Sequence, residues 1–345
     1  MMKIANHVIT KRSKTLIIAE VGQSHLGNIK KAERIIKKIS KTGVEFIKFQ
    51  THISNQESTL DEPFRKNISE FKNRMQYWKK MEFTLKQWKQ LQNICKKNNL
   101  TFLSSPFSLK AVEILKKLNV PAWKIGSGEF FSKSLLDKIL EYKQPIIIST
   151  GLATLREISR LTNYLKRKKA KYILMQCTSL YPCKLKDIGI NMIDVYKKNF
   201  NCYVGLSDHT GTIYPSLMAI AKGASLIEVH VGDKNDEKNP DNSSSISFSE
   251  LNEVSKTRDA IYTMVKNVQD KKKLSPKLKK IKRIFTKSCA LKEAKNQGEI
   301  IKQEDIIFKK PGTGIPENKI KLIIGKKLIK NVSSNRLLKM SDLRK

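Results

Sequence analysis

The chain has 345 residues, which is long enough for one large domain with a small one, or for two domains of medium size. Its apolar content of 39% is typical of a globular protein, and no apolar run is long enough to span a membrane. The net charge is +37, but lysines outnumber arginines and are scattered over the predicted helices, which favours solvated surface over a nucleic-acid site.

Short apolar or β-branched runs recur along the first 231 residues, and each is predicted to be a strand. The runs cover residues 16–21, 46–50, 101–105, 123–127, 145–150, 172–177, 203–207 and 226–231. Their nearly continuous apolar character suits strands that are buried on both faces. Helical patterns lie between them, at residues 28–43, 85–99, 108–119 and 155–169. Eight alternations predict an α/β (β/α)8 TIM barrel, with an open doubly wound sheet as the alternative.

The rest of the chain divides into segments of different residue composition. Residues 52–83 are longer than a usual connection and are predicted to form a helical insertion over one end of the barrel. The barrel domain is predicted to cover residues 1–268, ending in a helix from 249. A basic linker is expected at 269–283, with a nucleic-acid arm as the less favoured interpretation. Short apolar runs broken by Pro, Gly and Asn then predict a small, mainly β domain at 284–345.

Polar residues stand at the carboxyl ends of all eight predicted strands, which is where barrel enzymes carry their catalytic groups. Lys48 and Lys124 lie within two of these strands, and buried lysines are rarely tolerated unless they are paired or bound to something. We therefore expect an anionic substrate between them. Serine hydroxyls at neighbouring strand ends would complete the hydrogen bonds of that anion.

Two histidines stand one strand apart in the predicted barrel. His209 and His230 are separated by 21 residues, so both are expected at the same end of neighbouring strands. Such a pair predicts a divalent metal site with open positions for water or substrate, whereas the alternative is that each ring only makes local hydrogen bonds. His25 and His52 also follow strands and are candidates to join the site.

Cysteine usage points to a reducing compartment. The five cysteines are odd in number and contain no CxxC spacing, which excludes a disulfide scaffold and a structural zinc site. The N-terminus has no apolar core of the signal-peptide kind. We expect a cytoplasmic protein with no membrane and no nucleic-acid partner.

Eight motifs in chain order resemble the N-acetylneuraminate (sialic acid) synthase family. They read IIAEVGQSHLGN, FIKFQTH, FLSSPFS, WKIGSGE, IIISTG, QCTSLYP, GLSDHTG and IEVHV, while FKKPGTGI and IIGKKL resemble that family's C-terminal antifreeze-like (SAF) domain. The resemblance implies condensation of phosphoenolpyruvate with an N-acetylhexosamine such as N-acetylmannosamine and water, which releases phosphate and a nine-carbon 2-keto sugar acid. It also implies a divalent cation, Mn²⁺ or Mg²⁺, and a homodimer in which the SAF domain of one chain covers the barrel of the other.

The resemblance also implies roles for individual residues. His209 and His230 match metal ligands, and Glu20 matches a catalytic acid near the reacting carbons. The phosphoenolpyruvate site is matched by Lys48, Gln50, Ser105, Lys124, Ser127, Ser149, Ser179 and Ser207. The sugar site is matched by Glu129, Tyr181, Asp241 and Lys310.

The chain departs from the family pattern on the sugar side. Many members have Arg where Lys310 stands, and Asn where Ser24 and Ser179 stand; the loop that usually reads GPD is NPD at 239–241. Legionaminic, pseudaminic or spore-coat-type sugar acids are therefore alternative products. Two more distant alternatives are a metal-dependent or Schiff-base aldolase without phosphoenolpyruvate, and a non-catalytic barrel that binds nucleic acid.

Overall fold

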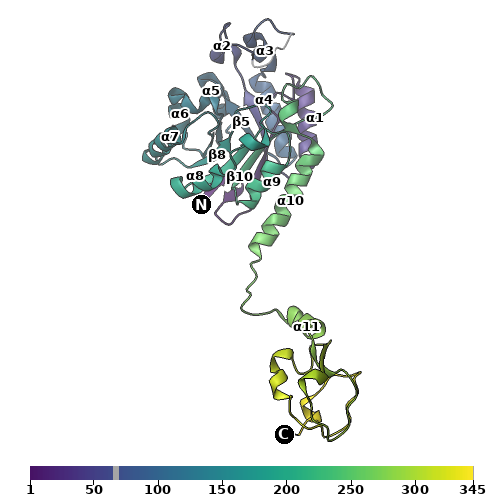
Figure 1. Cartoon of the computed structure of the whole chain (residues 1–345). Coiled ribbons are helices and arrows are strands. Elements are labelled where there is room, and N and C mark those ends of the chain that lie inside the picture. The colour runs from purple at the N-terminus through teal and green to yellow at the C-terminus, as the bar shows by residue number, and fades with distance from the viewer. Residues whose placement is uncertain (65–69, 345) are drawn as a thin grey trace. The chain divides into compact units, whose positions relative to one another are not determined.

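The eight apolar runs form the parallel strands of a barrel in the first of two units, Met1–Asn267 and Val268–Lys345. The computed structural model describes residues 1–64 and 70–344. The strands are β3 (Leu16–Glu20), β4 (Phe46–Thr51), β5 (Thr101–Pro106), β6 (Trp123–Ile125), β7 (Ile146–Ser149), β8 (Tyr172–Cys177), β9 (Tyr203–Asp208) and β10 (Leu226–Val231). They pair in the order β5-β4-β3-β10-β9-β8-β7-β6, and β5 lies against β6. The barrel is thus nearly closed (Figure 1), and the TIM-barrel prediction is confirmed.

Helices follow the strands and cover the outside of the barrel. They are α1 (Ile29–Ile39), α4 (Leu85–Lys97), α5 (Leu109–Lys117), α6 (Lys133–Leu140), α7 (Leu155–Arg167), α8 (Met192–Phe200), α9 (Tyr214–Ala221) and α10 (Phe248–Lys266). Thr84, Thr154 and Ser247 begin their helices with capping boxes, in which the hydroxyl accepts a backbone N–H of the first turn. Among the described helices, none combines the length and apolarity needed to span a bilayer.

The strand side chains alternate between two apolar layers. Ile47 and Phe49 of β4 point outward and pack under the helices, whereas Phe46 points into the barrel. A hairpin of β1 (Met2–Ile4) and β2 (His7–Ile9), which the sequence analysis did not predict, adds Met2, Ile4 and Ile9 to the interior cluster. The interior is therefore plugged by apolar side chains at the end where the strands begin.

The predicted insertion contains α2 (Ser54–Glu57) and α3 (Arg74–Met81), with residues 65–69 of that span outside the described residues. Figure 1 shows these two helices at one end of the barrel and the N-terminus at the other. Shorter elements of the same unit are the parallel strand β11 (Ser245–Ile246) beside β10 and the 3-10 turns η1 (Gly128–Phe131), η2 (Leu185–Asp187) and η3 (Asn242–Ser244).

The second unit has its own small core of Cys289, Leu291, Ile301, Leu328 and Leu338. Its elements are α11 (Pro276–Phe285), β12 (Ser288–Leu291), β13 (Ile306–Lys309), η4 (Gln303–Asp305), η5 (Glu317–Leu322) and η6 (Met340–Asp342). The expected linker at 269–283 is thus helical from residue 276 onward. The signal was present in the sequence, because Ser275 caps the helix and proline suits its first position.

Candidate active site

A cavity of about 300 Å³ opens at the carboxyl ends of the barrel strands, beneath the insertion. Most of the predicted site residues line it, namely Lys48, Gln50, Ser105, Lys124, Ser127, Glu129, Ser149, Ser179, Tyr181, Ser207, His209, His230 and Asp241. Glu20 is fully buried beside Lys48. Lys310 belongs to the second unit, where its ammonium group lies 5.2 Å from the centroid of the Phe285 ring. The predicted contact of Lys310 with a sugar stays a prediction.

Four buried charged groups lie together at the floor of the cavity, and three of them, Lys48, Lys124 and Glu228, line it. Lys48 Nζ lies 2.6 Å from Glu20 Oε2 and 3.7 Å from Glu228 Oε1. Lys124 Nζ lies 3.4 Å from the same Glu228 oxygen. The two ammonium groups therefore share a carboxylate, and their mutual repulsion is offset within the protein as well as by any bound anion.

The carboxyl groups of this cluster are held in different states. Burial opposes the ionisation of Glu228, but the ammonium groups of Lys124 and Lys48 outweigh it and lower the pKa to about 2. Burial raises the pKa of Glu20, and the charge of Lys48 offsets this in part. Glu228 is thus ionised at neutral pH, whereas Glu20 binds a proton more readily than an ordinary glutamate.

Serine hydroxyls surround the two ammonium groups. Lys48 Nζ donates to Ser105 Oγ at 3.0 Å, and Lys124 Nζ donates to Ser149 Oγ at 2.8 Å. Ser207 Oγ donates to Glu228 Oε1 at 3.2 Å. Hydroxyls and ammonium groups in one buried space match the donors that a phosphate or carboxylate requires.

A second group of polar atoms surrounds Gly151. Its N–H donates to Ser127 Oγ at 3.0 Å, and a Cβ at this glycine would lie 2.4 Å from Ser179 Oγ and 2.9 Å from Cys177 Sγ. Ser179 Oγ is buried and has no hydrogen-bond partner within the described residues. A hydroxyl in this state is ready to donate to a ligand.

The two predicted metal ligands lie together, with ring centroids 5.2 Å apart. His209 Nδ1 is 3.0 Å from the carbonyl oxygen of Thr178. Because that oxygen only accepts, the neutral ring carries its proton on Nδ1 and its lone pair on Nε2, where the Tyr181 hydroxyl donates at 3.1 Å. A carbonyl that fixes the tautomer in this way is the usual support of a metal-bound histidine.

The second histidine also fits a cation. Nδ1 of His230 is buried without a hydrogen-bond partner among the described residues, and it lies 3.7 Å from Asp241 Oδ2. Burial lowers the pKa of this ring to about 4, which keeps it neutral, as a ligand must be. Over residues 1–64 and 70–344, no three or more His, Cys, Asp or Glu side chains group to hold a metal. The protein would thus supply two imidazoles and leave the other positions to water or substrate.

The other two candidate histidines separate in the structure. His25 packs on Phe83 with ring centroids 4.7 Å apart, and its Nδ1 accepts the N–H of Gly27. Burial lowers its pKa to about 3, and it is not part of the cavity wall. His52 does line the cavity, between the rings of Trp78 and Phe107.

The sugar-side residues lie near the cavity mouth. Burial, followed by the charge of Glu57, raises the pKa of Glu129 to about 7. Asp241 stands in the loop after β10, and its Oδ2 accepts the N–H of Gln23 at 3.0 Å. Tyr181 stacks on the His209 ring at a centroid distance of 4.2 Å.

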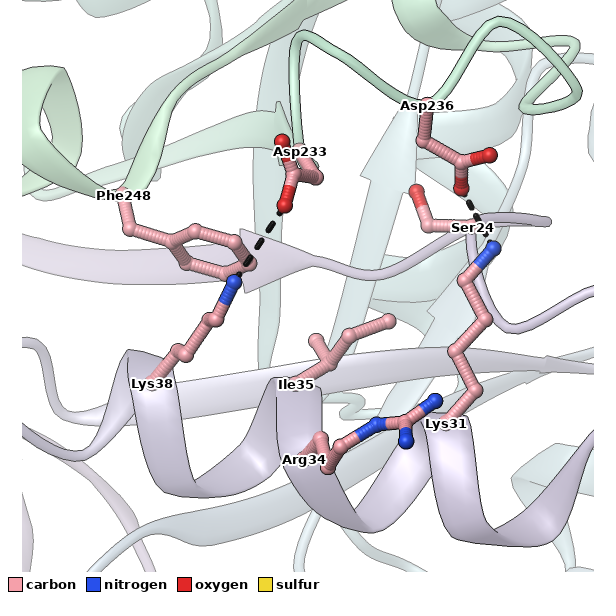
Figure 2. A pocket seen from close by; sticks show the side chains of 8 residues that line it. All are labelled: Ser24, Lys31, Arg34, Ile35, Lys38, Asp233, Asp236 and Phe248. Atoms are coloured by element: carbon pink, nitrogen blue, oxygen red, sulfur yellow. Dashed lines mark hydrogen bonds and ion pairs between the residues drawn. The ribbon is translucent and has the colours of Figure 1, made fainter.

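Two ion pairs and one hydrogen bond join the loop after β10 to α1 and to the segment that precedes this helix. Lys38 lies 3.3 Å from Asp233, and Lys31 pairs with Asp236 (Figure 2). In addition, Asn239 Nδ2 donates to Ser24 Oγ at 2.9 Å. Ser24 and Asn239, which both depart from the family pattern, are therefore in direct contact, so a substitution at one position alters the surroundings of the other.

Part of the cavity wall is not predicted by the sequence motifs. Glu228 was not assigned a role, although it precedes His230 by two residues and so faces the same side of β10. Trp78, Arg74 and Glu62 of the insertion also line the cavity. No pattern in the sequence signals their position, because the insertion reaches the mouth only through tertiary packing.

Family models match most of the chain. The model of the NeuB family matches residues 35–270, and that of the SAF domain matches residues 296–344. The chain is 33% identical over 338 residues to the N,N'-diacetyllegionaminic acid synthase of Campylobacter jejuni, which covers 94% of this chain and 99% of the relative. It is 31% identical over 242 residues to the human N-acetylneuraminate-9-phosphate synthase, covering 69% of this chain and 67% of the relative.

Solved structures agree with these matches. The sialic acid synthetase of Leptospira borgpetersenii, solved with citrate, superposes with a TM-score of 0.71 at 26% identity, over 81% of this chain and 94% of that one. The spore coat polysaccharide biosynthesis protein spsE of Bacillus subtilis superposes with a TM-score of 0.67 over 100% of this chain and 99% of that one; its 22% identity supports the fold alone.

Proposed function

Because the chain belongs to the NeuB family and is a sugar acid synthase, we propose that it condenses phosphoenolpyruvate with the open-chain aldehyde of an N-acetylated hexosamine. C3 of phosphoenolpyruvate would bond to the aldehyde carbon, and water would add at C2. The C2–O bond would then break, so that inorganic phosphate leaves and a nine-carbon 2-keto acid remains.

One observation carries this proposal, namely two buried ammonium groups with serine hydroxyls in a single cavity. Lys48 and Lys124 flank Glu228 and each donates to a serine. When Glu20 binds a proton, which its raised pKa favours, the cluster keeps one uncompensated positive charge. An anion with phosphate and carboxylate groups would complete the balance.

The remaining site residues have roles in the same scheme. His209 and His230 would hold a divalent cation, Mn²⁺ or Mg²⁺, which when bound supplies a Lewis acid that polarises the aldehyde. Glu20 would hold or release a proton that the condensation moves. Glu129, Tyr181 and Asp241 would orient the acceptor sugar at the mouth.

The acceptor is proposed to be N-acetylmannosamine or a 2,4-diacetamido relative. The legionaminic acid synthase of Campylobacter jejuni matches this chain over nearly its whole length, and the human N-acetylneuraminate-9-phosphate synthase matches two thirds of it. Trp78, Phe107 and Leu152 are apolar residues that also line the cavity, and such surfaces suit a sugar that carries acetamido methyl groups.

The test is phosphate release from phosphoenolpyruvate against N-acetylmannosamine, N-acetylglucosamine and 2,4-diacetamido-2,4,6-trideoxyhexoses, with Mn²⁺ or Mg²⁺. We expect release to require both an acceptor and the cation. An ¹⁸O label in the bridging oxygen of phosphoenolpyruvate should appear in the phosphate. Absence of release with every acceptor would contradict the proposal.

Metal dependence has a separate test. His209→Ala and His230→Ala are expected to abolish turnover while leaving the melting temperature close to that of the parent. The cation itself can be followed by the relaxation enhancement of water protons on Mn²⁺ binding. A variant that kept both near-normal turnover and Mn²⁺ binding would remove that histidine from the metal site.

We further propose a cytoplasmic homodimer in which the second unit of one chain covers the cavity of its partner, with Lys310 acting across the interface. The five free thiols support a reducing compartment. Mixing Lys310→Ala with His230→Ala tests the exchange. If Lys310 acts across the dimer, the hybrid contains one site with both residues intact, and activity returns; action within one chain restores nothing.

A further inference from the structure

A chain of hydrogen bonds links the insertion to the buried acid. Glu57 Oε1 lies 2.7 Å from His52 Nδ1, and His52 Nε2 lies 3.2 Å from Gln50 Oε1. Gln50 Nε2 in turn donates to Glu20 Oε1 at 3.0 Å. The described residues thus form a continuous path from α2, through the end of β4, to the proposed catalytic carboxyl.

The donor and acceptor atoms along this path can be assigned. Gln50 Oε1 only accepts, so the facing Nε2 of His52 must carry a proton. Glu57 then either accepts from Nδ1 of a doubly protonated ring or gives its own proton to that nitrogen. In both states Nε2–H points at the amide oxygen, and the amide nitrogen is left facing Glu20.

The His52 ring cannot turn away from this contact. It is buried, with Trp78 stacked on one side at a centroid distance of 4.0 Å and Phe107 at 4.5 Å. The two stacks are nearly parallel to the ring, at 16° and 13°. Because Trp78 belongs to α3, the insertion clamps the ring that orients the amide.

We propose that His52, held by Glu57 and by the two aromatic rings, is a positioning residue that keeps the Gln50 carboxamide with its NH2 group on Glu20. The Gly22 N–H donates to the same Glu20 oxygen at 3.0 Å, so the two donors fix that carboxyl group opposite Lys48. A reversed amide would present its oxygen to Glu20 and repel the carboxylate. The kinetic tests of this role rest on the proposed function, because they measure kcat of the proposed reaction.

Graded replacements of His52 separate the hydrogen bond from the packing. His52→Phe keeps the stack and loses both ring nitrogens, His52→Asn keeps a donor near Glu57, and His52→Gln keeps a donor near Gln50. We expect kcat to fall roughly tenfold to a hundredfold in the Phe and Asn variants, in line with the loss of one hydrogen bond to a charged group. The Gln variant should recover most of that loss.

The matched control is His25→Phe, since His25 is also buried after a strand but does not line the cavity. This variant is expected to change stability without changing kcat. Equal kcat losses in the Phe, Asn and Gln variants of His52 would overturn the proposal, because the donor position would then be irrelevant.

A double-mutant cycle shows whether His52 acts through Gln50. In a Gln50→Ala background, His52→Phe is expected to lower the remaining kcat by less than about twofold, because the amide that it positions is gone. Full additivity would assign His52 to direct substrate contact and overturn the proposal.

A spectroscopic readout is independent of turnover. Long-range ¹H–¹⁵N spectra of the histidine rings should report a protonated Nε2 for His52 in the parent and in Glu57→Gln. A bare Nε2 in the parent would overturn the positioning role even if phosphate release is found. Conversely, failure of phosphate release together with a protonated Nε2 would contradict the proposed function alone.

Discussion

The barrel interior has two halves that use equivalent positions of the same strands. Near the strand starts, inward-facing side chains are apolar and join the hairpin plug; two residues further on, the inward side chains are charged or hydroxylic. The pairs are Ile18 and Glu20, Phe46 and Lys48, Leu103 and Ser105, Ile147 and Ser149, and Leu226 and Glu228. The change occurs within a single step of the period-two alternation.

The two halves contribute differently to stability. Burial of apolar side chains stabilises the folded state by roughly 25 cal/mol per Å². The apolar half near the strand starts, called the lower half below, is therefore explained by its contribution to stability. Buried ion pairs are seldom better than apolar residues of the same volume, because desolvation offsets their attraction. The polar half at the strand ends, called the upper half below, is therefore explained by its role in binding and catalysis. Substitutions in the lower half should reduce stability, and substitutions in the upper half should reduce activity.

The largest effect is expected in the upper half. Lys124→Met leaves Lys48, at 3.7 Å, as the lysine that still pairs with Glu228. The kcat/KM for phosphoenolpyruvate should fall about a hundredfold to a thousandfold, as for loss of a preorganised donor at a reacting group. Unfolding in urea should show a loss of about 3–5 kcal/mol from the broken buried pair. Adding Glu228→Gln should recover stability but not activity; recovery of activity would contradict the anion role.

The lower half should show the reverse pattern. Ile147→Ala is expected to destabilise the protein by about 2–5 kcal/mol, because it leaves a cavity in the plug. At temperatures where the variant is folded, kcat should stay within about twofold of the parent. A large kcat loss in the folded variant would mean that the two halves are not separable.

A smaller and more specific effect is expected at Gly151. Gly151→Ala would press a methyl group against Ser179 Oγ and Ser127 Oγ, and the KM for phosphoenolpyruvate should rise roughly tenfold to a hundredfold through displaced donors. Gly128→Ala is the matched control, because it adds a methyl group to the cavity wall but meets no protein atom within 4 Å. Equal kinetics for the two variants would place the anion away from Gly151.

The mouth should show a pH-dependent effect on stability. The pKa of Glu129 is raised from 4.5 to about 7, so the folded state favours the protonated acid and loses stability as pH rises between these values. Glu129→Gln mimics that acid and should raise the melting temperature by about 2 °C at pH 8. The gain should vanish at pH 4 and shrink in Glu57→Gln; a pH-independent gain would contradict the assignment.

The smallest effect concerns Ser24 and Asn239, the two departures that are in contact behind the cavity-lining residues Gln23 and Asp241. Ser24→Asn would crowd the Asn239 amide and raise the KM for the sugar severalfold, whereas Asn239→Gly removes the crowding. The double variant should behave like the parent. Independent, additive effects would show that the contact between Ser24 and Asn239 has no role in sugar binding.

Much of this architecture was predictable from local pattern. Each of the eight strands falls where an apolar run stands, since a strand buried on both faces needs apolar residues at nearly every position. Lys48, Lys124, Ser105 and Glu228 interrupt those runs and face inward, so their clustering followed from the barrel itself. The hairpin plug was missed because its two strands are only three residues long.

The contacts that give the site its chemistry depend on closure of the barrel. Glu228 follows Lys48 by 180 residues and Lys124 by 104 residues in the chain, and no local rule states that one carboxylate lies between two ammonium groups. The insertion likewise places Trp78 on His52 through packing across the mouth. Periodicity records which face a residue occupies along its own strand, whereas distances across the interior arise only when all the strands are assembled.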